Sequence, residues 1–510
     1  MAGDSKVRAW LTLTADVLRA AVRPREAADR RATAPASGAD AGGGDRPGGG
    51  GAHEGGGAGL DADADARRRA LVRTAVRGGR LLALARIRSV FAGPRRRRRI
   101  REDAARRAAE DAARTLGGMK GLAMKFGQFA SFAGGLSAGA EEELAHLQAS
   151  APPMEYDAVA GILEREFGTK VFRRFESFER EPLAAASIGQ VHAATLRDGT
   201  RVVVKVQYPG IEDAVFADFD NLALLTRAYA VGVDFDVQAV LRDLSAMMKD
   251  EFDYEREAAD QRRFADAYRG HPFVKIPEVV PELTSRHVLT AELVEGRSLR
   301  DVLAAGDQAG LDRYGEIIYR FALGSIAAGH FSVDPHPGNY LFMADGRVCF
   351  LDFGLVKRMP GEREIALTTA PVVAALHDRR DDLAAALDGL GMVPHRGRSD
   401  PDRLWREVGP LYCGPVAEDR AIRLDPDEYG KALRVVNKPT SEFYKCRKAP
   451  YQPPWLSMLL RYTMGTMAVL ARLRCEANWH RLAAELVDGG PPATDIGARW
   501  EERDAAASFR

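Results

Sequence analysis

The sequence predicts an α+β fold in which a β-rich lobe is followed by a helical lobe. From 170 to 295 the chain contains short β-branched runs at 187–196, 201–208 and 287–293. From 296 to about 480 the pattern is mostly helical, around one short strand pair. Of the 510 residues, 46% are apolar and 28% are charged, so the chain can bury a sizeable core.

Charge and cysteine content exclude several classes of protein. The chain has 73 Lys and Arg against 72 Asp and Glu, a net charge of +1, which gives no global case for specific nucleic-acid binding. The four cysteines are far apart with no C-x-x-C pair, which excludes a disulfide scaffold and a thiolate zinc site. No apolar run of about 18 residues is present, and we expect no secretory signal peptide. The expected location is the cytoplasm, including its membrane face.

The first third of the chain divides into segments of different composition. Helical spacing of apolar residues predicts an amphipathic helix within 1–31. Residues 32–66 are Ala, Gly, Asp and Pro with almost no large apolar side chain, which is typical of a flexible linker. Residues 102–153 read as helices broken by glycine pairs and ended by two prolines.

The segment 67–101 is strongly basic. It contains fourteen arginines and no acid, with an apolar stripe at helical spacing. Three interpretations stay open: a helix packed on the rest of the protein, peripheral contact with an anionic membrane surface, or contact with nucleic acid. After it we expect a β-rich lobe at 154–295, a helical lobe at 296–480 and a loose tail at 481–510.

Two segments of the β-rich lobe are suited to phosphate. A strand-turn-strand of small residues lets backbone N–H groups approach phosphates closely, and Ala185, Ala186, Ser187 and Gly189 form it here. Lys205 lies within an apolar strand run, where its ammonium needs a partner because an unpaired buried charge is costly. Phosphate oxygens and a carboxylate would supply that partner.

Two segments of the helical lobe carry acids suited to phosphoryl transfer. Asp334 and Asn339 are five residues apart in a Pro- and Gly-rich loop, which matches the D-x-x-x-x-N of a phosphoryl-transfer loop. Asp352 opens an Asp-Phe-Gly sequence directly after an apolar strand run. Asn339 and Asp352 offer the oxygen ligands that Mg²⁺ prefers. The ordered set predicts a site for ATP and Mg²⁺.

The set resembles a bilobal protein-kinase-like fold, and more narrowly the UbiB/AarF family of atypical kinases. Three features narrow it: an Ala-rich nucleotide loop, the K-x-G-Q sequence from Lys125 to Gln128 in a helical extension before the lobes, and the E-x-D segment 251–253. The resemblance covers roughly residues 105–480.

The resemblance implies a role for each matching residue. Lys205 would bind the α- and β-phosphates, with Glu257 as its carboxylate partner and Glu251 as the next candidate. Asp334 would be the catalytic-loop acid, and Asn339 and Asp352 would hold Mg²⁺. Lys125 and Gln128 would reach the active site from a segment folded over the cleft. The backbone from Glu292 to Val294 would meet adenine.

One departure and one absence bear on function. Many relatives have His two residues before the catalytic Asp, whereas this chain has Ser332. After Asp352 there is no A-P-E sequence of the kind that ends the activation segment of protein kinases. We therefore expect an ATPase or a kinase for a small or lipid-like acceptor, linked through the family to isoprenoid-quinone or other lipid metabolism at a membrane. The alternatives are a nucleotide-gated protein that binds or extracts a lipid, and, less favoured, a conventional protein kinase.

Overall fold

The computed structural model describes most of two lobes and little of the chain before them. Lys125, Gln128 and Ser187 lie outside the described residues, as do the predictions for 1–31, 32–66 and 102–153 and nearly all of 67–101. The described residues are 154–186, 188–217, 219–220, 245–246, 248–332, 334–390, 401–408, 415–436, 441 and 454–501, with single positions at 77, 80, 84, 93 and 96.

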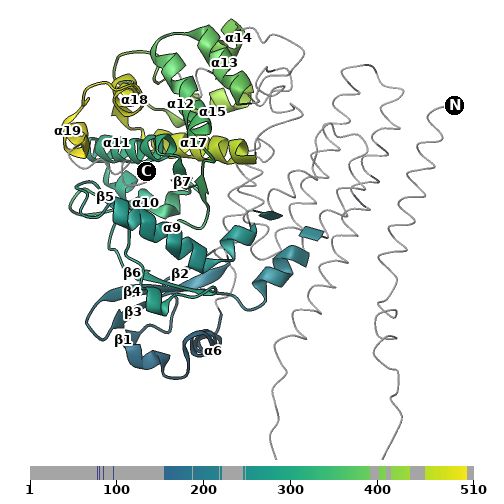
Figure 1. Cartoon of the computed structure of the whole chain (residues 1–510), viewed down its shortest axis with the longest axis vertical. Helices are drawn as coiled ribbons and strands as arrows, with labels where there is room; N and C mark the ends of the chain where they lie inside the picture. The colour runs from purple at the N-terminus through teal and green to yellow at the C-terminus, as the bar shows by residue number, and fades with distance from the viewer. Residues whose placement is uncertain are drawn as a thin grey trace, which may run out of the picture. The chain divides into compact units, whose positions relative to one another are not determined.

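An antiparallel sheet forms the β-rich lobe (Figure 1). Its strand order is β1-β3-β4-β6, and β2 pairs with β3. The strand runs expected from sequence are confirmed with ends shortened by one or two residues. The bounds are β1 Phe175–Phe178, β2 Ala184–Ala185, β3 Gly189–Leu196, β4 Arg201–Gln207 and β6 Val288–Glu292.

Alternation along β4 determines which side chains are buried. Val202, Val204 and Val206 are fully buried and pack on helix α6 (Tyr156–Phe167), while Lys205 points to the other face of the sheet. The β3–β4 turn is closed by Gly199, whose φ of 85° few other residues adopt, and by the Thr200 N–H, which donates to the Asp198 carboxylate at 2.9 Å. This alternation is what presents a single lysine on the face of the sheet opposite the buried valines.

The helical lobe is built around one long buried helix, α11. Two cores meet on it, one shared with the short strands and one shared with α12, α13 and α17. Figure 1 shows α11 and α17 side by side, in agreement with their many contacts. The helices are α9 Tyr254–Ala267, α10 Leu299–Ala305, α11 Gln308–Ala327, α12 Glu362–Leu376, α13 Arg380–Gly389, α14 Pro401–Val408, α15 Pro426–Val436 and α17 Pro454–Leu473.

Short strands flank the loops that carry the predicted site residues of the helical lobe. β8 (Tyr340–Phe342) and β9 (Val348–Phe350) form the expected hairpin. Sequence reasoning did not anticipate β5 (Val274–Lys275), which pairs with β9 in parallel, or the pairing of β7 (His330–Ser332) with β10 (Val356–Arg358). Two- and three-residue strands have no periodicity to detect.

The prediction of a loose tail at 481–510 was wrong for the part that the structure describes. Helices α18 (Trp479–Val487) and α19 (Asp495–Glu501) pack on the helical lobe. Trp500 stacks on Phe273 with ring centroids 6.2 Å apart, and the fully buried Arg320 donates to Glu485 of α18. The charged, Ala-rich composition of this segment gave no indication that Trp500 and Glu485 make these packing contacts.

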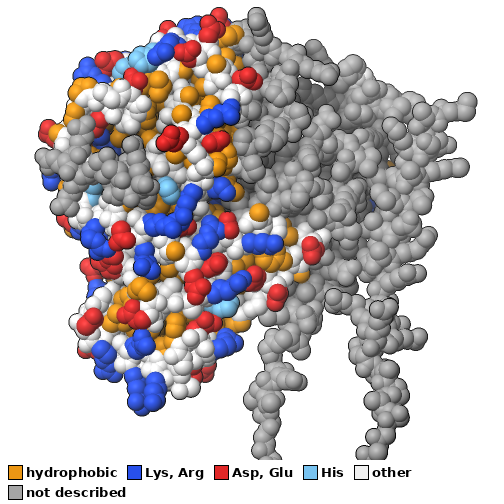
Figure 2. Space-filling view, viewed as in Figure 1, with side chains coloured by type: hydrophobic (Ala, Val, Ile, Leu, Met, Phe, Trp, Pro, Cys, Tyr) orange, Lys and Arg blue, Asp and Glu red, His pale blue; other side chains and the backbone are white. Residues whose placement is uncertain are grey.

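The surface shown in Figure 2 has basic and acidic side chains interspersed over both lobes. Among the described helices, none combines the length and apolar character that crossing a bilayer requires. The 20-residue helix α17 is the most apolar of the long ones, but it includes Arg461 and Arg472.

Candidate active site

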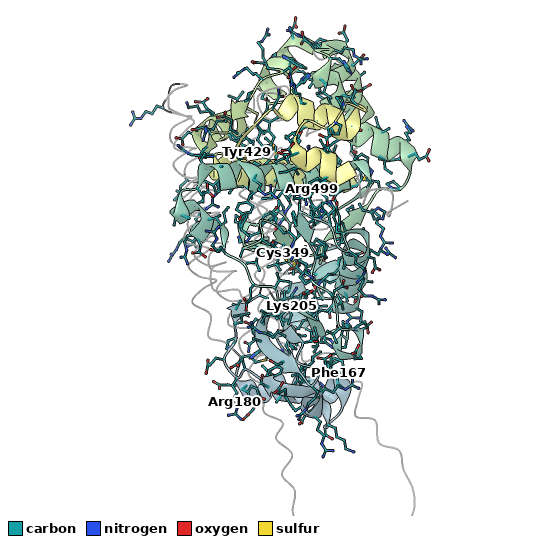
Figure 3. All side chains as sticks on the ribbon, turned by 90° about the vertical axis from the view of Figure 1, so that its left-hand side faces the viewer. Phe167, Arg180, Lys205, Cys349, Tyr429 and Arg499 are labelled. Carbon is teal, nitrogen blue, oxygen red and sulfur yellow. The ribbon has the colours of Figure 1, made fainter. Side chains whose placement is uncertain are left out.

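A lysine–glutamate ion pair joins the sheet to helix α9. The Lys205 ammonium donates to both carboxylate oxygens of Glu257, at 2.9 Å each. The side chain of Glu257 is 3% exposed, and that of Lys205 is 20% exposed. Figure 3 shows Lys205 between Phe167 and Arg180 of the β-rich lobe and Tyr429 of the helical lobe. The structure therefore pairs Lys205 with Glu257 rather than with Glu251, which is buried at the end of the helical segment before α9.

Burial and neighbouring charges shift the pKa values of both groups in this pair. Burial would lower the pKa of the Lys205 ammonium, but the Glu257 carboxylate outweighs burial, so the pKa lies above its ordinary value. Burial raises the pKa of the Glu257 carboxyl to about 7, opposed by Lys205 and reinforced by the negative charge of Asp352. The Lys205 Nζ lies 4.5 Å from the centroid of the buried Tyr254 ring, a cation–π contact. The Lys205 ammonium is thus fixed in position by Glu257 and stays charged.

The position at which helix α9 begins places Glu257 beside Lys205. Asp253 is its N-cap, and the Asp253 carboxylate accepts from the Arg256 N–H at 3.0 Å. Glu257 lies four residues further on, one turn into the helix, on its buried face. In the E-x-D segment, Asp253 therefore has a structural task in the geometry seen here.

The loop after β7 brings Asp334 and Asn339 together. The Asn339 side-chain amide donates to the Asp334 carbonyl oxygen at 2.9 Å. A 3-10 turn at Pro337–Asn339 follows His336, whose Nδ1 accepts from the Gly338 N–H at 3.1 Å. This bond helps to shape the loop between Asp334 and Asn339.

Strand register brings Asn339 beside Asp352. Tyr340 pairs with Phe350 across the β8–β9 hairpin, and the Leu351 N–H donates to the Asn339 carbonyl at 3.0 Å. Asp352 is the next residue, and its Oδ1 accepts from the Gly354 N–H at 2.9 Å. The hairpin thus sets two oxygen-bearing side chains at one strand end.

These two residues fit a Mg²⁺ ion by their donor chemistry. The Asn339 amide nitrogen is used by the Asp334 carbonyl, so its Oδ1 is the atom left for a cation. The Asp352 side chain offers a carboxylate, whose Oδ1 accepts from the Gly354 N–H. Amide and carboxylate oxygens are hard ligands. The negative charge of Asp352 is one cause of the raised pKa of Glu257. A cation bound at Asp352 would offset that negative charge.

The other predicted site residues occupy the edge of the β-rich lobe. Ala185 is exposed on β2, which pairs with β3 through Ala185 and Gln190. The Ala186 N–H donates to the Gly189 carbonyl at 2.9 Å, which closes the small-residue turn. Gly189 itself lies so close to β4 that an added Cβ would overlap the Val206 carbonyl oxygen.

The expected adenine-contacting strand lies at the opposite end of the sheet order. Glu292 ends β6, and its carboxylate pairs with the Lys275 ammonium at 2.6 Å and accepts from the Glu278 N–H. The Glu292 side chain therefore has a structural role. Val294 is partly exposed. A backbone role for these residues toward adenine stays a prediction.

Comparison with known proteins agrees with this geometry. Residues 146–384 match the model of the ABC1 atypical kinase-like domain. A solved structure of Rv3197 from Mycobacterium tuberculosis, in complex with erythromycin, is 30% identical to this chain, with a TM-score of 0.56. That similarity covers 76% of this chain and 98% of the other.

The chain belongs to the ABC1 atypical kinase-like family. The resemblance to UbiB/AarF proteins and the kinase-like fold are thereby confirmed. The chain is 38% identical over 232 residues to Protein ACTIVITY OF BC1 COMPLEX KINASE 3, chloroplastic, of Arabidopsis thaliana. It is 32% identical over 269 residues to Atypical kinase COQ8, mitochondrial, of Saccharomyces cerevisiae. The alignments span 33% and 53% of these two relatives, and 44% and 51% of this chain.

Ser332 connects the Asp334 loop to Asp352 in this ABC1 kinase-like chain. Its hydroxyl donates to the Asp352 carbonyl at 3.3 Å and accepts from the Asp334 N–H at 3.5 Å. Both bonds are long, but they link the Asp334 loop to the strand end that carries Asp352. The replacement of His by Ser therefore does not leave the two loops unconnected.

Sequence reasoning missed two residues of the candidate site in this ABC1 family member. Tyr254 lies under Lys205, and Arg461 of α17 lies 3.6 Å from Asp334. The sequence contains a signal for Arg461, because a charged residue within an apolar helical run needs a buried partner. Tyr254 had no comparable signal, because an aromatic residue at a helix start is usually ordinary core.

Proposed function

We propose that this protein binds Mg-ATP between its lobes and acts as an ATPase or as a kinase for a small or lipid-like acceptor. The observation that carries the proposal is the two-oxygen ion pair between Lys205 and Glu257, close enough to Asp352 for its charge to act on both. Such an arrangement holds a lysine ammonium at one position, where phosphate oxygens can share it.

Each residue then has a task that its position permits. Lys205 would hold the α- and β-phosphates and Glu257 would hold Lys205. Asn339 and Asp352 would hold Mg²⁺, which neutralises charge that develops as the phosphoryl group moves. Asp334 would orient the attacking hydroxyl or water and accept its proton. Positioning and charge neutralisation supply most of the catalysis in reactions of this kind.

Family membership supports the link to isoprenoid-quinone or other lipid metabolism. Protein phosphorylation is the less favoured option, because Pro360 and Gly361 lead directly into α12 without an A-P-E sequence. Membrane contact through 67–101 rests on the run of arginines alone. Removing residues 1–101 would test it: weaker binding to anionic liposomes with unchanged ATP binding supports the contact, and equal liposome binding refutes it.

A second candidate is a nucleotide-gated protein that binds or extracts a lipid, with little turnover. It is favoured by the position of the Asp334 carboxylate, which is 8% exposed and faces Arg461 rather than open solvent. Nucleotide would then drive lobe closure, and hydrolysis would be incidental.

Phosphate release from Mg-ATP tests the proposal. We expect release by the full-length protein, a rise with anionic liposomes, and its loss in Asp352→Asn, because that change removes a charge from a metal ligand. Asp345→Asn, in the exposed β8–β9 turn, is the matched control and keeps release. No release by the parent protein, with ATP still raising its melting temperature, would favour the nucleotide-gated candidate. Equal release by Asp352→Asn would refute the metal assignment.

A further inference from the structure

An ion pair joins helix α9 to the strand that follows Asp352. The Arg358 guanidinium at the end of β10 donates to the Asp260 carboxylate of α9, with 2.7 Å between Nη2 and Oδ1. Asp260 is 5% exposed, whereas the side chain of Arg358 is 46% exposed. A nearly buried carboxylate needs a counter-charge, because burial without one is costly. Arg358 supplies that charge from a strand 98 residues further along the chain.

Two other arginines near Asp260 belong to α9 itself. Arg256 Nε lies 3.9 Å and Arg263 Nη1 lies 3.6 Å from the Asp260 carboxylate. Burial raises the pKa of the Asp260 carboxyl, and the charge of Arg358 opposes that rise more than the charge of Arg256 does. The contact with Arg358 is therefore the shortest of the three, and it is the one that connects α9 to another element.

Both partners of this ion pair lie next to residues of the candidate active site. Asp260 is three residues after Glu257, so the two side chains lie on adjoining turns of one helix face. Arg358 ends the segment that begins at Asp352. β10 pairs with β7, the strand that leads into the loop of Asp334. The ion pair therefore connects the helix that holds the lysine to the segments that carry both acids.

Two further contacts hold the same segment against α9. The buried rings of Phe353 and Phe264 have centroids 4.9 Å apart. The Glu257 carboxylate lies beside Gly354, where an added Cβ would come 3.3 Å from Oε2. The segment after β9 thus rests on one face of α9 at three points, of which the Arg358 contact is the one between opposite charges.

The position of α9 decides whether the candidate site is assembled. A shift of α9 away from the sheet would separate Glu257 from the Lys205 ammonium, which it now holds by two bonds of 2.9 Å. A shift of the segment after β9 would carry Asp352 away from Asn339. When only a fraction of the molecules has the assembled arrangement, the apparent affinity for a ligand falls by that fraction.

We propose that Asp260 and Arg358 are positioning residues that keep α9 and the Asp352 segment together before nucleotide binds. This inference rests on the function proposed for the cleft. Bound Mg-ATP would itself restore the arrangement through its contacts with Lys205 and Asp352. The ion pair therefore acts on the affinity for nucleotide and not on the rate of the saturated protein.

Phosphate release from Mg-ATP by the full-length protein tests the inference. We expect Asp260→Asn and Arg358→Met each to raise KM for ATP about fivefold and to keep kcat within about twofold of the parent value. The dissociation constant of a fluorescent ATP analogue should rise by the same factor. A loss of folding stability would instead remove active protein and lower the apparent kcat. Arg358→Lys returns the charge and should recover part of the affinity.

A double variant and a matched control make the test specific. Asp260→Asn and Arg358→Met remove the same contact, so together they should raise KM about fivefold, whereas two independent effects would multiply to about 25-fold. Arg263→Met is the control, because Arg263 is 49% exposed and contacts Asp260 from within α9. We expect this control to bind ATP as the parent does.

Three outcomes would overturn this inference alone, in a parent protein that binds the ATP analogue. They are unchanged affinity in both single variants, multiplied effects in the double variant, and a loss in Arg263→Met equal to that in Arg358→Met. A parent protein that neither binds the analogue nor releases phosphate would overturn the proposed function, and this inference with it.

Discussion

The Nη2 atom of Arg461 lies 3.6 Å from Oδ1 of Asp334, and both side chains are nearly fully buried. Arg461 belongs to α17, a helix far along the chain from the loop that carries Asp334. A buried guanidinium beside a catalytic-loop carboxylate keeps that carboxylate in one orientation, because rotation would separate two poorly hydrated charges. The proposed catalytic base is therefore positioned by the helical lobe as well as by its own loop.

Arg461→Met should lower kcat for phosphate release about tenfold and change KM for ATP little, because Lys205 and Asp352 still hold the nucleotide. Arg461→Lys should restore part of kcat, since it returns the charge but not the planar fork. Steady-state kinetics measure both values. Arg472→Met, on the exposed face of the same helix, is the control. Equal losses of kcat in the Met and Lys variants would argue against positioning through charge.

Glu257→Gln should weaken ATP binding about tenfold while leaving the fold intact. The neutral amide cannot hold the Lys205 ammonium with two charged contacts, so the lysine gains freedom that nucleotide binding must remove. Binding of a fluorescent ATP analogue gives the dissociation constants. Glu255→Gln lies on the exposed side of α9 and should bind as the parent does. Unchanged affinity in Glu257→Gln would remove the main support for the proposed nucleotide site.

Two glycine-to-alanine changes should move stability in opposite directions. At Gly189 an added Cβ overlaps the Val206 carbonyl, so we expect a loss of about 1–3 kcal/mol in the free energy of unfolding. At Gly161, on the exposed side of α6, nothing lies within 4 Å, and alanine should add about 0.5–1 kcal/mol. Urea denaturation measures both. A neutral Gly189→Ala would mean that β3 can move away from β4 freely.

Cys349 and Cys475 should resist alkylation in the native protein. Burial raises the pKa of the Cys349 thiol to about 12, and burial also raises the pKa of Cys475. Iodoacetamide reacts with the thiolate, so both peptides should stay unmodified at mildly alkaline pH and react after denaturation in guanidinium. Peptide mass spectrometry reads both states. Rapid labelling of Cys349 without denaturant would show that the β9 region opens locally.

Much of the fold was predictable because its elements are long or strongly patterned. The valine alternation of β4 and the β8–β9 hairpin were expected within a residue or two. The tail was not, because Trp500 and Glu485 are isolated anchors in an Ala-rich stretch, and their partners Phe273 and Arg320 lie far away in sequence. Contacts of that separation leave no local pattern.

For the candidate site, motifs placed the residues but could not choose between neighbours. Sequence left Glu257 and Glu251 both open as partners of Lys205, and helix phase in α9 decided for Glu257. Similarly, only the β7 and β9 geometry reveals how Ser332 reaches Asp352. Spacing identifies chemistry, whereas the choice of partner depends on packing between elements.

The ion pair between Arg320 and Glu485 has a consequence for how this protein is made. Arg320 is fully buried in α11, and Glu485 is synthesised 165 residues later. While the ribosome is still translating the intervening chain, the guanidinium lacks this carboxylate and α11 cannot complete its core at low cost. We expect the β-rich lobe to mature before the helical lobe, which must wait until α18 has been synthesised, so that a nascent chain stalled before α18 would be a client for chaperones.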